Sequence, residues 1–140
     1  MIEQKELQAL MEFQGKGPVL SVYLDTDLAH QSKDAIKLMF RQRVKNLSSD
    51  VSSEIRAVEK FLDFEYDWQA RGLAIFASGK ELWKTIPLPI PVRTQAFLAD
   101  KPYVRVLTDV MDRFAKYGVA LIDSESLRLF LVAWGKIEAV

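Results

Sequence analysis

The chain has no cysteine and only one histidine among its 140 residues. Without cysteine there can be no disulfide scaffold, thiolate nucleophile, thiolate zinc site or iron–sulfur cluster, and such a chain is typical of a reducing cytoplasm. The single His30 has no second imidazole with which to share a metal ion, and no glycine-rich phosphate-binding loop is present. We therefore expect no metal and no cofactor, and we predict that the chain is not an enzyme.

Long apolar runs are also missing. No run approaches the roughly 20 residues that a membrane-spanning helix requires, and the sequence at Met1–Glu6 is not that of a signal peptide. Apolar residues make up 49% and charged residues 27% of the chain, both ordinary for soluble globular proteins. These features predict a cytoplasmic protein with no membrane partner.

The chain has no overall excess of charge of either sign, since 19 basic residues balance 19 acidic ones. It therefore does not bind polyanions in the manner of a strongly basic domain, and we expect no DNA partner. The largest local basic excess lies in residues 31–60, which carry seven basic and four acidic side chains. Any contact with a phosphate backbone is expected there.

Apolar periodicity predicts a mixed α/β fold, a small mixed β-sheet packed by helices. A helical hairpin is expected over about 33–64, with Ser32 or Asp34 as its N-cap and the first helix ending near Asn46. Three prolines confine the stretch at 82–91 to a sheet edge or a loop. The other expected elements are helices at 2–13 and 103–115, strands at 19–24, 72–77 and 94–98, and a C-terminal β-hairpin formed by 118–123 and 127–134.

Four cations are spaced by four residues along the second expected helix. They are Lys33, Lys37, Arg41 and Lys45, and this spacing places them in one stripe beside the apolar face of the helix. Such a stripe can follow a phosphate backbone, and each contact then makes binding salt-dependent. The alternative is the ordinary solvated face of an amphipathic helix.

Two carboxylates, Asp25 and Asp27, end the first expected strand, at the kind of position where open α/β sheets place ligands. They resemble the first motif of haloacid-dehalogenase-like phosphotransferases, in which one Asp is the nucleophile and the other the acid/base around Mg²⁺. The alternative is a pair of loop carboxylates that cap the next helix.

The large aromatic residues are scattered along the sequence. This scatter favours core or rim positions over a platform on which nucleobases stack. The residues concerned are Tyr23, Trp68, Trp83 and Tyr103.

The order of segments resembles the bacterial branch of the archaeo-eukaryotic release factor superfamily, which includes class-1 peptide-chain release factors and the ribosome-rescue protein Pelota. The segments that carry the resemblance are VYLDTD at 22–27, GLAIFAS at 72–78, IPLPIP at 86–91, FLADKPYVRVL at 97–107 and YGVALIDSESLRLFLVAWGKIEAV at 117–140. The resemblance implies that residues 1–116 are an N-terminal recognition domain and that 117–140 is the first β-hairpin of a truncated central domain. The Gly-Gly-Gln tripeptide that is catalytic in the family is absent from this chain.

Two family motifs can be compared residue by residue. Phe97, Ala99 and Tyr103 have the spacing of the Tyr-x-Cys-x-x-x-Phe motif of the stop-codon pocket, with the aromatic ends kept and the cysteine lost. We expect these residues to pack the last helix onto the sheet. The hairpin loop that carries Asn-Ile-Lys-Ser in the family contains here Asn46, Leu47, Ser48, Ser49 and Asp50.

The resemblance therefore implies a non-catalytic, release-factor-like recognition domain that binds the ribosome or structured RNA in translation termination or ribosome rescue. A homo-oligomeric interaction module without an RNA role is the alternative, and a small Mg²⁺-dependent phosphotransferase using Asp25 and Asp27 is a third. We also expect self-association, as a homodimer, through 117–140, because both faces of the strand at 127–134 are apolar; the alternative is that this hairpin packs onto the chain's own sheet.

Overall fold

The computed structural model describes residues 4–47 and 49–120 of the chain. They form four α-helices, one short 3₁₀ turn and four β-strands. In chain order the elements are α1 (Gln4–Glu12), β1 (Val19–Asp25), α2 (Lys33–Val44), the 3₁₀ turn η1 (Ser49–Val51), α3 (Ser52–Phe64), β2 (Gly72–Ser78), β3 (Leu82–Leu88), β4 (Gln95–Ala99) and α4 (Arg105–Ala120). The predicted α/β class is confirmed, as is the helical hairpin over 33–64.

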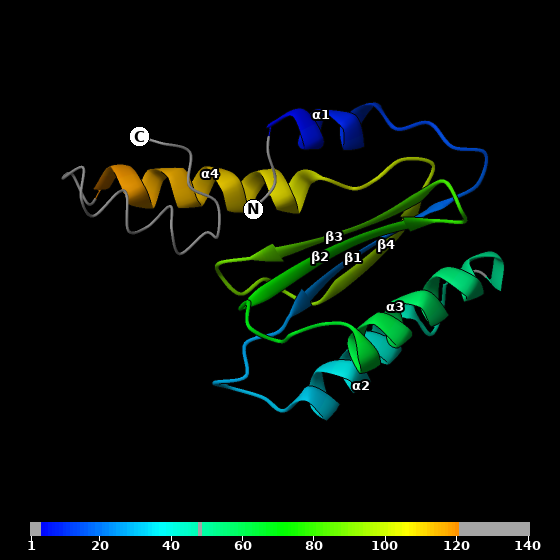
Figure 1. The fold of residues 1–140 in the computed structure, drawn as a ribbon, viewed down its shortest axis with the longest axis horizontal. Coiled ribbons are helices and arrows are strands. Elements are labelled where there is room, and N and C mark those ends of the chain that lie inside the picture. The colour runs from blue at the N-terminus through cyan, green and yellow to red at the C-terminus, as the bar shows by residue number, and fades with distance from the viewer. Residues whose placement is uncertain (1–3, 48, 121–140) are drawn as a thin grey trace.

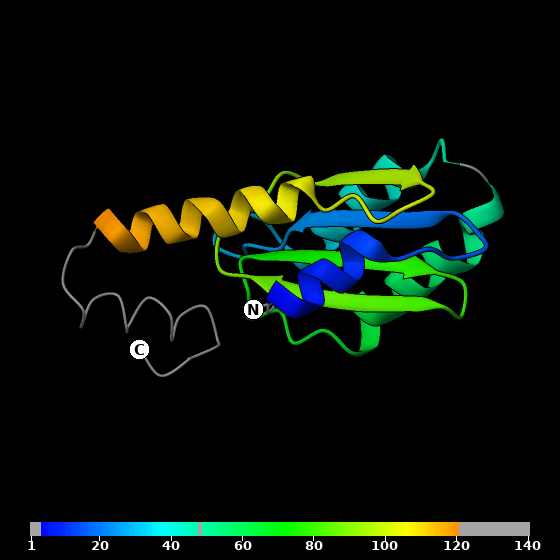
Figure 2. The same cartoon turned by 90° about the horizontal axis from the view of Figure 1, so that it is seen from above.

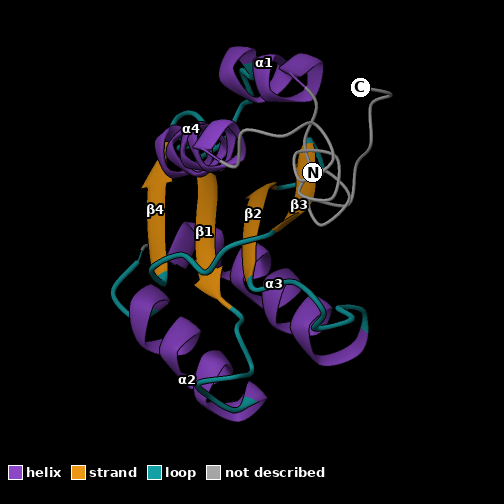
Figure 3. Cartoon of the chain, turned by 90° about the vertical axis from the view of Figure 1, so that its left-hand side faces the viewer, coloured by secondary structure: helices purple, strands orange, loops and turns teal. Residues whose placement is uncertain are grey.

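The four strands make one sheet in the order β3-β2-β1-β4, and each neighbouring pair is antiparallel. Helices cover both faces of this sheet (Figure 1). The view along the sheet shows α4 and α1 on one side, and α2 and α3 on the other (Figure 3). The domain is therefore a three-layer α/β/α sandwich.

The two central strands explain this layering. Every residue of β2 is buried, and so is every residue of β1 except Asp25. Successive side chains of a strand point to opposite faces, so an apolar strand needs cover on both sides. On one face Tyr23 and Phe76 belong to the core under α1 and α4, and on the other face Val22 and Ile75 belong to the core over α2 and α3.

The proline-containing strand β3 lies at the edge of the sheet, as the sequence predicts. Pro87 pairs with Leu73 of β2, and proline is tolerated at such an edge because its missing N–H can face solvent. Opposite, β4 forms the second edge. No helix among the described residues is long and apolar enough to cross a membrane.

Both β4 and α4 begin slightly later in the chain than predicted, and residues just before them form hydrogen bonds with β1, which is distant in the sequence. The Thr94 hydroxyl accepts a hydrogen bond from the Asp25 amide at 3.1 Å. The amide of Tyr103 donates to the Ser21 hydroxyl at 2.9 Å, and its carbonyl accepts from the hydroxyl of Tyr23. The backbone of Tyr103 is thus bonded to side chains of β1, and α4 starts at Arg105.

Helix α4 also continues further than the predicted end at 115, and it projects past the end of the sheet (Figure 2). Gly118, Val119 and Ala120 are helical, whereas the sequence analysis placed them at the start of a strand. One glycine lowers helix propensity by about 1 kcal/mol, which does not end a helix by itself. The rest of the expected C-terminal hairpin lies outside the described residues, and the division into two domains at 116 stays a prediction.

A buried carboxylate joins the start of α3 to the turn between β2 and β3. Glu54 accepts a hydrogen bond from the Ser53 hydroxyl at 2.6 Å and another from the Gly79 amide at 3.0 Å. Gly79 has a φ of +50°, a conformation that glycine adopts without a steric penalty. Burial raises the pKa of Glu54, but these hydrogen bonds outweigh it, so the pKa lies below the ordinary glutamate value.

The Glu54→Gln variant is predicted to be less stable than the wild type by about 1 kcal/mol at neutral pH, because a charge-assisted hydrogen bond is lost. Since the folded-state pKa is lowered, ionised Glu54 stabilises the fold above the unfolded value of about 4.3, and this contribution disappears as the pH falls through the folded value. Urea unfolding of both proteins across acidic pH measures the effect.

The free energies of unfolding of the wild type and Glu54→Gln should therefore converge on acidification. Glu65→Gln, at an exposed position just after α3, is the matched control and should stay within about 0.5 kcal/mol of the wild type throughout. A constant difference between the wild type and Glu54→Gln down to strongly acidic pH would show that the Glu54 charge is not what stabilises this turn.

Candidate nucleic-acid interface

The basic stripe lies along one flank of α2. Ile36, Phe40 and Val44 are buried against the sheet, and a cation follows each of them in the sequence. Ser32 begins the helix as its N-cap, accepting a hydrogen bond from the Ala35 amide at 3.1 Å. Of the four cations of the stripe, Lys37 is half-buried. The other three, Lys33, Arg41 and Lys45, are exposed.

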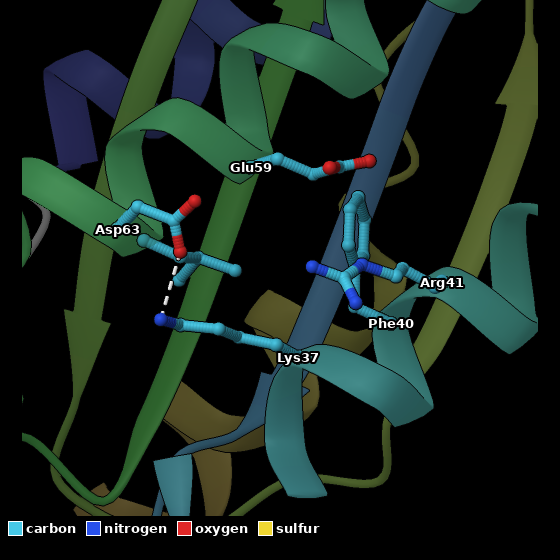
Figure 4. Close-up of a pocket in the computed structure, with 6 residues that line it drawn as sticks. Lys37, Phe40, Arg41, Glu59 and Asp63 are labelled. Atoms are coloured by element: carbon cyan, nitrogen blue, oxygen red, sulfur yellow. Dashed lines mark ion pairs between the residues drawn. The ribbon is translucent and has the colours of Figure 1, made fainter. Parts of the chain in front are cut away.

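Helix α3 brings acidic side chains up to the middle of this stripe. The Lys37 ammonium forms an ion pair with the Asp63 carboxylate at 2.7 Å, and Figure 4 shows Glu59 projecting from α3 into the same space near Arg41. The depression between the two helices encloses no space for even a water-sized molecule, whereas small-molecule sites enclose roughly 300–1,000 Å³. The arrangement is a charged surface, and Lys37 is partly neutralised within it.

At the N-terminal end of the stripe, four aromatic rings follow one another across the surface. The ring of Trp83 on β3 contacts Phe61 of α3 with centroids 5.9 Å apart, Phe61 contacts Tyr66 at 5.6 Å, and Tyr66 contacts Trp68 at 5.1 Å. The ammonium of Lys33 lies 5.5 Å from the centroid of the Trp68 ring. The stripe and this aromatic row are therefore continuous.

The row is not visible in the sequence because its members are separated along the chain. The predicted core or rim positions are confirmed, since Tyr23 is buried and Trp68 and Tyr103 pack against the core, but the rings are not scattered in three dimensions. Trp68 and Trp83 belong to the row, whereas Tyr23 and Tyr103 both belong to an aromatic group on the opposite face of the sheet. The signal present in the sequence is the close spacing of Phe61, Tyr66 and Trp68, at the end of α3 and in the loop that follows it.

The backbone at Trp68 adopts a left-handed conformation with a φ of +61°. Such a conformation is rare for bulky residues and costs about 1–3 kcal/mol. Neighbouring contacts hold the loop in place: the Tyr66 hydroxyl lies 3.3 Å from the Thr26 hydroxyl, and Asp67 accepts from the Gln69 amide at 3.1 Å. Burial raises the pKa of Tyr66, so its hydroxyl stays protonated at neutral pH.

The loop of the helical hairpin lies at the far end of α2. The helix ends at Val44, slightly before the predicted Asn46, and the Leu47 amide donates to the Val44 carbonyl at 3.1 Å. Asn46, Ser49 and Asp50 are exposed, and Ser48 lies outside the described residues. The loop thus places polar and acidic groups at the surface.

The three residues at the spacing of the stop-codon motif lie on the other face of the sheet. The rings of Phe97 and Tyr103 stack with centroids 4.0 Å apart, and Phe97 also meets Tyr23 edge-on at 6.3 Å. Ala99 pairs with Val19 at the end of β4 and is exposed. Phe97 and Tyr103 pack against the core under α1 and α4, although both remain half-buried.

The two carboxylates at the end of β1 and just after it, Asp25 and Asp27, are engaged in a turn. An Asp25 oxygen accepts from the Asp27 amide at 3.1 Å, and Asp27 accepts from the Ala29 amide at 3.0 Å. The Arg71 guanidinium donates to the other Asp27 oxygen at 3.2 and 3.3 Å. The Ala29 amide and Arg71, against the opposing effect of burial, hold the pKa of Asp27 below its ordinary value. These carboxylates do not cap α2, which is the function of Ser32.

Within residues 4–47 and 49–120, no group of three or more histidine, aspartate or glutamate side chains is arranged to hold a metal ion. No protein-family model matches the chain, and no curated protein matches it. The candidate interface therefore stands on its geometry: a cationic flank of α2, an acidic neighbour on α3 and an aromatic row at one end.

Phe97→Ala is predicted to lower the free energy of unfolding by about 2–3 kcal/mol, below the roughly 3–5 kcal/mol of a fully buried phenylalanine, because Phe97 is half-buried. The matched control is Phe64→Ala, since Phe64 is 80% exposed at the end of α3 and should change stability by less than about 0.5 kcal/mol. Chemical denaturation measures both. Equal effects from the two variants would contradict the packing role of Phe97.

Proposed function

We propose that this chain is a release-factor-like recognition domain that binds the ribosome or structured RNA through the basic flank of α2. The resemblance in segment order motivates the class of protein, and the surface of α2 supports the class of ligand. As presented, the domain recognises and does not catalyse, because the family's Gly-Gly-Gln tripeptide is absent from its sequence.

The observation that carries the proposal is the exposed row of cations on one helix flank. Lys33, Arg41 and Lys45 take part in no ion pair within the part of the chain that the structure describes. Cations that already lie in one line can meet successive phosphates of a nucleic acid, and each contact releases counterions. The row could therefore contact RNA without rearrangement of the helix.

The hairpin loop is a poorer candidate for the main contact. Asp50 occupies the part of the loop where a lysine approaches RNA in the resembled family, and an exposed carboxylate there repels phosphate. Phe97 and Tyr103, the counterparts of the stop-codon pocket, contact the core on the opposite face of the sheet. We therefore propose phosphate recognition by α2, independent of codon identity.

Charge reversal on α2 tests the proposal. The double variant Arg41→Glu, Lys45→Glu should weaken ribosome co-sedimentation and reduce the slope of log affinity against log salt by about 0.9 for each phosphate that the variant no longer neutralises. Both side chains are exposed, so the effect on stability should stay within about 0.5 kcal/mol per substitution.

The matched control is the double variant Lys101→Glu, Arg105→Glu, which makes the same charge change at exposed positions before and at the start of α4. It should bind ribosomes almost as the wild type does. Equal binding by the wild type and the α2 variant, or an equal decrease for both double variants, would contradict the proposed surface.

A variant with increased affinity provides an independent test. Asp63→Asn removes the carboxylate that pairs with Lys37 at 2.7 Å and thereby adds a fourth available cation to the stripe. Because exposed ion pairs contribute only about 0–1 kcal/mol to stability, the fold should tolerate the change. Filter binding at several salt concentrations should show tighter RNA binding with a steeper salt dependence, and weaker binding would count against this surface.

A homo-oligomeric interaction module is the second candidate, and the edge strand β4 favours it, because no further strand among the described residues pairs with its outer side. Residues Gln95–Ala99 contain neither a charge nor a proline, whereas the opposite edge strand β3 contains both Lys84 and Pro87. Unprotected edges can pair with another strand. The expected association through 117–140 stays a prediction, because 121–140 lie outside the described residues. Light scattering after size exclusion tests this candidate, and a monomer at all concentrations would contradict it.

A further inference from the structure

Trp68 combines three features at one surface position. Its backbone is in the left-handed region, its half-buried ring ends the aromatic row, and the exposed Lys33 lies over that ring. A bulky residue in a strained conformation persists only where surrounding contacts hold it, and such strain concentrates at functional sites. Trp68 packs partly against the core over α2 and α3, but it is only half-buried, so part of the side chain remains at the surface.

We propose that the Trp68 indole is a stacking site for an unpaired nucleobase of the RNA whose phosphates contact the basic stripe. This inference rests on the proposed function and specifies its ligand as RNA with a single-stranded segment next to the α2 contact. Trp68 presents an aromatic surface, and Lys33 supplies the cation for the adjoining phosphate.

The contact between Lys33 and Trp68 is compatible with both base stacking on the indole and phosphate binding by the ammonium. An exposed cation–π contact is weaker than the stacking of a base on an aromatic ring, so a base can replace the ammonium on the indole. The displaced ammonium remains on its flexible side chain at the start of α2 and can then pair with a phosphate. Lys33 thus covers the ring in the free protein without blocking it.

The neighbours of Trp68 support a fixed platform. Tyr66 contacts the indole at 5.1 Å between centroids, and its hydroxyl lies within hydrogen-bonding distance of the Thr26 hydroxyl just after β1. Thr26 in turn donates to the Ala70 carbonyl at 2.8 Å, and its amide donates to the Arg71 carbonyl at 3.2 Å. The loop that carries Trp68 is therefore attached to the sheet on both sides of the indole. Because the loop is already held in place, it loses less conformational entropy on binding a base than a mobile loop would.

The test compares single-stranded oligouridylate with a blunt-ended RNA duplex as probes. Trp68→Gly removes the indole, and glycine accepts the +61° φ without strain, so this variant should keep its fold by circular dichroism. It should bind oligouridylate about tenfold more weakly than the wild type and lose part of the tryptophan fluorescence quenching, whereas duplex affinity stays unchanged.

Two further variants of Trp68 distinguish stacking on an aromatic ring from contact with any large apolar side chain. Trp68→Phe should restore most of the oligouridylate affinity, and Trp68→Leu should bind as weakly as Trp68→Gly. Phe64→Ala is the matched control, because Phe64 is an aromatic residue that is 80% exposed at the end of α3 and is not a member of the row. It should leave affinity for both probes unchanged.

The outcomes distinguish this inference from the function on which it rests. Unchanged oligouridylate binding by Trp68→Gly, together with weaker binding by Arg41→Glu, Lys45→Glu, would overturn the stacking site and leave the basic surface intact. An equal decrease in affinity for both probes in Trp68→Gly would also overturn stacking. If the wild type binds neither probe nor ribosomes, the proposed function fails and the stacking site fails with it.

Discussion

The burial of β1 and β2 on both faces is the constraint on which the rest of the structure depends. Val22 and Ile75 on one face and Tyr23 and Phe76 on the other must all leave water, and each fully buried large apolar side chain contributes about 1.5–3 kcal/mol. One helical layer cannot cover both faces. The helical hairpin therefore takes one side and the pair α1 and α4 the other, which directs the cationic flank of α2 toward α3 and solvent.

Most of the fold could be predicted from the sequence, because apolar periodicity and the positions of prolines depend on local backbone preferences, which determine where helices, strands and sheet edges form. The apolar run of β1, the i, i+4 spacing at Ile36, Phe40 and Val44, and the prolines of the β3 edge each specify their element directly. The errors arose where long-range hydrogen bonds override local preference. Tyr103 is the clearest case, since its backbone bonds to side chains of β1 delay the start of α4.

Only part of the candidate site could be predicted from the sequence, because the rest depends on contacts between residues that are far apart in the chain. A four-residue spacing predicts that cations share a helix flank, but it says nothing about the facing helix, so the Lys37–Asp63 pair could not be foreseen. The aromatic row joins β3, α3 and the loop after it. Its members become neighbours only when the helical hairpin packs on the sheet, so tertiary structure alone brings Trp68 to the end of the stripe.

The proposed RNA-binding surface is the α2 side of the sandwich, with Trp68 at its end. Zero-length ultraviolet cross-linking of the wild-type chain to ribosomes, followed by peptide mapping, is the sharpest test of this surface. RNA adducts are expected on peptides from Lys33 to Lys45 and around Trp68. Adducts on α1 or α4 peptides alone, or spread evenly over all exposed surfaces, would contradict the proposed surface.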